Sequence, residues 1–148
     1  MLRGGASDVF QVLTLQKKAI RLLTGADYDA HCKPLFISEG LMTVFSLYVL
    51  TLLVDTKKDF ELFSLRQNVH TYNTRAKHKI DIPFVRLVKT QTQSHILGQK
   101  LFNRLPSTAQ TKSFSEFQIA IKKLLLANPL YSVNEFFQLP VSELSLYF

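Results

Sequence analysis

The sequence has few of the residues on which cross-linked folds and phosphate-cradling loops depend. Cys32 is the only cysteine among 148 residues, so an internal disulfide is impossible and a reducing compartment fits best. Tryptophan is absent, and the five glycines are too scattered to form a phosphate-binding loop. The longest apolar run, 41–54, is interrupted by Thr and Ser and is shorter than the roughly 20 residues of a membrane-spanning helix. We therefore expect an intracellular protein, nuclear or cytoplasmic, without a membrane segment.

The sequence also lacks a recognisable reaction centre. Asp27 and Asp29 have no third acid near them, so they are typical of a turn rather than of a two-metal site. Cys32 has only His31 beside it, and adjacent helical residues do not face each other. The histidines and the cysteine show no paired zinc-ligand spacing. We expect no cofactor, no metal and no enzymatic activity of the chain in isolation.

What the sequence does contain is a concentrated block of positive charge. Residues 62–112 hold nine Lys or Arg and a single acid, Asp81, within a chain whose net charge is +7. Residues 1–61 are neutral, and residues 113–148 carry a net charge of −1. Such a block attracts polyanions without determining the fold.

Apolar periodicity predicts an all-α fold of six or seven helices around an irregular basic connector at about 64–93. Prolines and helix-capping patterns delimit these helices, among them the capping box Ser113-x-x-Glu116. We expect one structural unit with N-terminal helices in 1–63, the connector, and C-terminal helices in 94–148. The helices are expected at about 7–24, 34–39, 43–58, 59–65, 94–105, 113–126 and 132–137.

Two groups of side chains are candidates for binding a nucleic acid. In the connector, Arg75, Lys77 and Lys79 alternate, Arg86 and Lys89 follow, and the aromatic Tyr72 and Phe84 lie among them, so phosphate neutralisation plus base stacking is chemically possible. We expect these cations to share one face; the alternative is a solvated basic loop with Phe84 in the core. In the first helix a basic side opposes a broad apolar side, and it is either a solvated face or a phosphate-facing ridge. The apolar residues are Val9, Val12, Leu15, Ala19, Ile20, Leu22 and Leu23, and the basic ones are Lys17, Lys18 and Arg21.

Several motifs then occur in an order that points to one family. They are LQKKAIR (15–21), HCKPLF (31–36), SLYVLTLL (46–53), HTYNTR (70–75), RLVKTQ (86–91), GQKLFNRLP (98–106), SFSEFQIAIKKLLL (113–126) and YSVNEFF (131–137). From about residue 8 to 137 the chain resembles the C-terminal region of non-LTR (LINE-type) retrotransposon reverse transcriptases of the jockey-like group.

The resemblance implies thumb and post-thumb helices that contact template RNA and the nascent duplex. It also implies a truncated or decayed element copy, since the F/Y-x-D-D motif of the catalytic palm, the fingers and the endonuclease are absent. The expected partners are then RNA or DNA and the missing palm and fingers, in a ribonucleoprotein of the element. By position, the resemblance adds contacts at Lys17, Lys18, Arg21, Asn73, Thr74, Arg75, Arg86 and Lys100.

Two other readings remain open at this point. The chain could be a domesticated helical interaction module that binds a protein through an apolar face between the second long helix and the C-terminal Phe cluster. It could also be a remnant without function.

Overall fold

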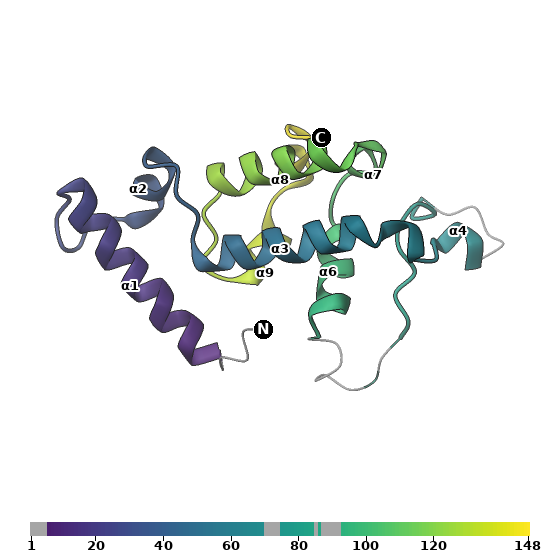
Figure 1. The fold of residues 1–148 in the computed structure, drawn as a ribbon, viewed down its shortest axis with the longest axis horizontal. Coiled ribbons are helices and arrows are strands. Elements are labelled where there is room, and N and C mark those ends of the chain that lie inside the picture. The colour runs from purple at the N-terminus through teal and green to yellow at the C-terminus, as the bar shows by residue number, and fades with distance from the viewer. Residues whose placement is uncertain (1–5, 70–74, 85, 87–92) are drawn as a thin grey trace.

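A computed structural model describes residues 6–69, 75–84, 86 and 93–148. These residues form helices joined by turns, with no strand among them, which confirms an all-α fold (Figure 1). The helices are α1 (Ala6–Thr24), α2 (Cys32–Ser38), α3 (Val44–Lys58), the 3-10 helix η1 (Phe60–Leu62), α4 (Arg66–Val69), α6 (Ser94–Phe102), α7 (Thr108–Thr111), α8 (Phe114–Ala127), α9 (Val133–Gln138) and α10 (Val141–Ser145). The expected number of helices was too low, because α4, α7 and α10 are too short to show a helical period in the sequence.

Glycine ends the first two helices. Gly25 and Gly40 both have positive φ angles, of 65° and 62°, which side-chain-bearing residues rarely adopt. After α2 the amide of Leu41 donates to the carbonyl of Phe36 at 2.9 Å and that of Gly40 donates to Ile37 at 3.1 Å, the paired bonds of a Schellman motif. The turn at Gly25 lies between α1 and α2, which pack against each other, and the turn at Gly40 lies between α2 and α3.

Helix α3 lies at the centre of the molecule, with α6 and α8 packed against it (Figure 1). The core contains Val49 and Leu53 of α3, Leu101 of α6 and Phe117 of α8, all fully buried. Gly98 permits the close approach of α6, because a Cβ atom there would lie 2.5 Å from Thr56 Oγ1 and 3.2 Å from the carbonyl oxygen of Leu52. The glycine of the GQKLFNRLP motif therefore has a packing role.

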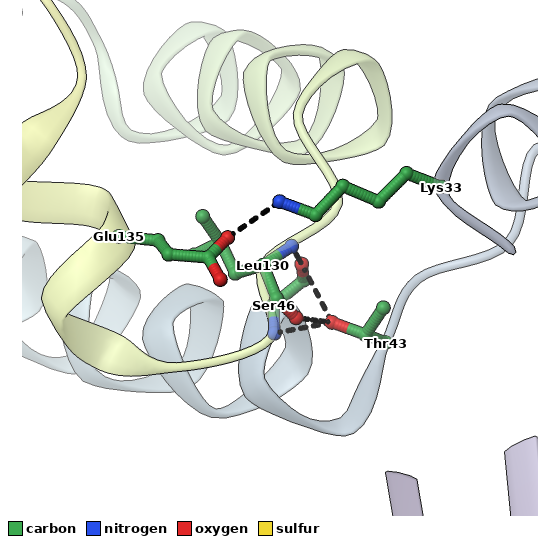
Figure 2. Close-up of polar contacts among 5 residues, drawn as sticks. All are labelled: Lys33, Thr43, Ser46, Leu130 and Glu135. Atoms are coloured by element: carbon green, nitrogen blue, oxygen red, sulfur yellow. Dashed lines mark hydrogen bonds and ion pairs between the residues drawn. The ribbon is translucent and has the colours of Figure 1, made fainter. Parts of the chain in front are cut away.

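Buried hydroxyls join the start of α3 to the segment before α9 (Figure 2). Thr43 caps α3 by accepting from the amide of Ser46 at 3.1 Å, and its hydroxyl donates to the carbonyl of Leu130. Ser46 in turn accepts from the amide of Leu130 at 3.1 Å. Nearby, Lys33 of α2 forms a 2.7 Å ion pair with Glu135 of α9. These contacts connect α2 and the start of α3 to α9 and to the segment before it.

The segment expected to be an irregular connector has more order than predicted. It contains the one-turn helix α4, and Leu65 and Ile80 form an antiparallel bridge. The prediction of an irregular connector missed these features, because backbone hydrogen bonds between residues far apart in the sequence leave no periodic signal. Of residues 84–88 the structure describes only Phe84 and Arg86, and neither has regular secondary structure.

The apolar surfaces also differ from those expected. On α1, Leu13 and Ile20 are buried, whereas Leu15, Leu22 and Leu23 are 63%, 84% and 73% exposed. The side that the helical wheel marks as apolar is thus largely uncovered. The surface proposed for a protein partner, between α3 and the C-terminal Phe cluster, is instead interior: Phe136 is fully buried in the same core cluster as α3. Several of the exposed apolar side chains lie on α1.

Candidate nucleic-acid interface

A cationic pocket of about 300 Å³ opens between the start of α4, the residues around Ile80, and the end of α6. Its lining contains four cations and no acidic side chain. The lining residues are Arg66, Lys79, Ile82, Lys100, Asn103, Arg104 and Phe137. Four like charges around one cavity repel each other, so an anion placed there would be stabilised by all of them.

Backbone hydrogen bonds bring the first two cations together. The amide of Arg66 donates to the carbonyl of Lys79 at 3.0 Å, and the amide of Asp81 donates to Ser64 at 2.8 Å. These bonds flank the bridge between Leu65 and Ile80, so two segments more than ten residues apart run side by side. The Arg66 and Lys79 side chains enter the pocket from this pair.

Asn103 attaches that pair to α6. Its amide side chain accepts from the backbone N–H of Ile80 at 2.8 Å and donates to the carbonyl of Ile80 at 2.9 Å. One asparagine thus satisfies both backbone groups of a fully buried residue, which fixes the position of the segment. Lys100 lies in α6 and Arg104 in the turn that follows this helix, and both line the pocket together with Asn103.

Arg104 links the pocket to the C-terminal helices and keeps one donor unused. Its Nη2 donates to the carbonyl of Leu139 at 2.8 Å. Its Nε is buried and has no acceptor within the described part of the chain. A buried guanidinium N–H without an acceptor is energetically costly.

Of the cations that the sequence singled out, the structure brings Lys79 and Lys100 together in this pocket. Arg75 and Arg86 are exposed and Lys77 is half-buried, and none of these three lines the pocket. Tyr72, Asn73, Thr74 and Lys89 lie outside the described residues.

The basic residues of α1 form a separate group. Figure 1 shows α1 at one end of the long axis and α4 at the other, with α3 between them. The Lys17 ammonium lies 3.8 Å from the centre of the Tyr131 ring, and the Arg21 Nε donates to the carbonyl of Ala30 at 3.0 Å. Lys18 is exposed. The cations of α1 therefore lie apart from the pocket, which Arg66 of α4 lines.

Tyr131 gives Lys17 and Lys33 a structural role. Burial raises the pKa of Tyr131 to about 12, with smaller contributions from Cys32 and Glu135, so the ring is a neutral phenol at pH 7. Lys17 and Lys33 therefore contact an aromatic face, at 3.8 and 4.8 Å from its centre, in cation–π geometry. This arrangement holds α1 and α2 against the segment before α9.

Sequence reasoning missed Arg66, Asn103 and Arg104. The spacing of Lys100, Asn103 and Arg104, which places them on one side of a helix end, was an available signal within the GQKLFNRLP motif. No comparable signal existed for Arg66, because its place in the pocket depends on pairing with the residues around Ile80.

In the part of the chain that the structure describes, no helix has the length and apolar character needed to cross a bilayer. Within the same residues, no three His, Cys, Asp or Glu side chains lie close enough to hold a metal ion. Comparison with known proteins found no match to a family model, to a curated protein or to a solved structure.

Proposed function

We propose that the chain binds the phosphate backbone of a nucleic acid through the cationic pocket, without a catalytic site of its own. The observation that carries the proposal is the convergence of Arg66, Lys79, Lys100 and Arg104 on one cavity whose lining has no acid. Arginine and lysine are the usual phosphate ligands in proteins.

The sequence resemblance supports the same proposal and gives it a context. A segment of a non-LTR retrotransposon reverse transcriptase, without palm or fingers, would hold template RNA or nascent DNA while chemistry occurs elsewhere. Lys79 and Lys100 then neutralise phosphates while α3 and α6 keep the pocket rigid.

A salt titration tests the proposal. Binding of a fluorescein-labelled oligonucleotide is measured by anisotropy at several salt concentrations for the parent chain and for a variant carrying Arg66→Ala and Lys100→Ala. Loss of two phosphate contacts is expected to weaken binding and to reduce the slope of log K against log salt by about 1.4 for a single strand. The matched control is Lys122→Ala with Lys123→Ala, which removes the same charge from two exposed residues of α8. Equal losses in both variants would show that only net charge matters and would refute the pocket.

A second candidate function is favoured by the uncovered stripe of α1, formed by Val12, Leu15, Ala19, Leu22 and Leu23. Its spacing of three and four residues is that of a helix–helix seam, which fits a protein-interaction module. A second copy of the chain is the partner that can be tested directly, by sedimentation of the parent and of a Leu15→Ser, Leu22→Ser variant. Salt-insensitive self-association that the variant abolishes would favour this function, and a monomeric parent would count against it.

A further inference from the structure

Phe84 differs from every other phenylalanine in the chain. All twelve phenylalanines lie within the described residues, and eleven of them are at most 50% exposed, whereas Phe84 is 94% exposed. Several of the others form ring pairs in the core, as Phe102 does with Phe60 and Phe117 at 5.2 and 5.6 Å. The alternative in which Phe84 is placed in the core is therefore wrong, and its ring is free to contact a ligand.

The hydrogen bonds between Asn103 and Ile80, which build the pocket, also determine where Phe84 lies relative to it. Asn103 fixes Ile80, and Ile82, two residues later, lines the pocket. Phe84 follows after two more residues, and an extended chain spans roughly 7 Å over that distance. The exposed ring thus lies within reach of a strand whose phosphate occupies the pocket, and the exposed Arg86 lies two residues further along the chain.

An aromatic ring beside a cationic pocket is the combination that binds single strands. Each nucleotide of a single strand offers a phosphate and an unpaired base with an open face, so one strand can neutralise the cations and stack on the ring together. In a duplex the bases are already stacked on one another, and a ring outside the helix reaches only the sugar–phosphate surface. Phe84 would then contribute to one form of nucleic acid and not to the other.

We propose that the ligand of this site is single-stranded nucleic acid, with one phosphate in the cationic pocket and a neighbouring base stacked on Phe84. This inference rests on the proposed function and adds the class of ligand to it. The pocket supplies charge, and Phe84 supplies the preference for an unpaired strand.

The test compares a fluorescein-labelled single strand of mixed sequence with a hairpin duplex of the same length. Phe84→Ala is expected to weaken binding of the single strand by about 5-fold to 100-fold, the usual range for losing one stacked base. Its salt slope should stay unchanged, because no charge is removed, and its affinity for the hairpin should stay unchanged as well. Phe114→Ala, which truncates a less exposed ring on α8, is the matched control and should affect neither ligand.

A second variant reports the contact directly. Because the chain has no tryptophan, Phe84→Trp introduces a single fluorescent indole at the proposed contact. It should keep the preference for the single strand, and its emission should be quenched when the single strand binds but not when the hairpin binds.

The results separate this inference from the proposed function. If the Arg66→Ala, Lys100→Ala variant loses binding while Phe84→Ala binds the single strand as the parent does, the pocket stands and the single-strand inference is refuted. Equal losses for single strand and hairpin in Phe84→Ala would refute it too. If the parent binds neither ligand, both proposals fail.

Discussion

Replacing Gly98 by alanine tests whether α6 and α3 pack as closely as the structure shows. The new Cβ would lie 2.5 Å from Thr56 Oγ1, a distance that Cβ atoms essentially never show, and 3.2 Å from the carbonyl oxygen of Leu52. Thr56 is buried, and its hydroxyl donates to that same carbonyl at 2.7 Å, so it cannot turn away without losing a hydrogen bond. Either α6 moves outward or the bond breaks.

The expected magnitude is the difference between two opposing effects. Overpacking of a well-packed core costs about 1–3 kcal/mol. Alanine is about 1 kcal/mol more favourable than glycine inside a helix. We therefore expect Gly98→Ala to lower the free energy of unfolding by about 1 kcal/mol, measured by urea denaturation followed by circular dichroism.

Two backgrounds show whether Thr56 is the cause. In Thr56→Ala the hydroxyl is absent, so adding Gly98→Ala should cost about 1 kcal/mol less than in the parent. In Thr56→Ser the Oγ atom remains, and the cost should persist. If Gly98→Ala stabilised the parent by about 1 kcal/mol, as helix propensity alone predicts, the close packing of α6 on α3 would be refuted.

Three further substitutions test other contacts. Asn103→Ala removes both hydrogen bonds to Ile80 and should lower the free energy of unfolding by about 1–3 kcal/mol. It should also weaken oligonucleotide binding, because Lys79 is then no longer held in place, and unchanged binding in a folded variant would contradict this. Thr43→Val removes a buried hydroxyl that bonds the carbonyl before α9 and should cost about 1–3 kcal/mol in urea denaturation, and a cost near zero would show that the bond is not needed. Ser113→Ala removes a cap and should cost about 1 kcal/mol at pH 7. Hydrogen bonds from Ser113 lower the pKa of Glu116 from 4.5, so this carboxylate stabilises the folded state above pH 4.5, and the contribution is lost as the pH falls through the lowered pKa. The stability difference between the Ser113→Ala variant and the parent should therefore shrink in acid. A difference that does not shrink would contradict the assignment.

The helices with a strong apolar period could be predicted from the sequence, and so could the capping box of Ser113, which the structure confirms. The helical period shows which side of a helix is apolar, but not which side is covered. For this reason α1 buries Ile20 while Leu22 on the predicted apolar side remains 84% exposed.

The candidate site was only partly predictable for a similar reason. Lys79 and Lys100 stand out as cations in a basic segment, but their convergence depends on the attachment of Ile80 by Asn103, a contact between residues 23 apart in the sequence. Local patterns do not specify such contacts. Arg66 was missed because it joins the pocket only through its pairing with Lys79.

The double hydrogen bond of Asn103 has a consequence for how the molecule responds to its ligand. The pocket is lined by residues of α4, of the segment around Ile80 and of α6, so a bound ligand contacts all three segments and holds them together. A ligand that binds only the folded chain raises the free energy of unfolding, by an amount that grows with ligand concentration. An oligonucleotide should therefore raise the melting temperature and slow amide hydrogen exchange around Ile80 and along α6, while leaving exchange in α1 as it was.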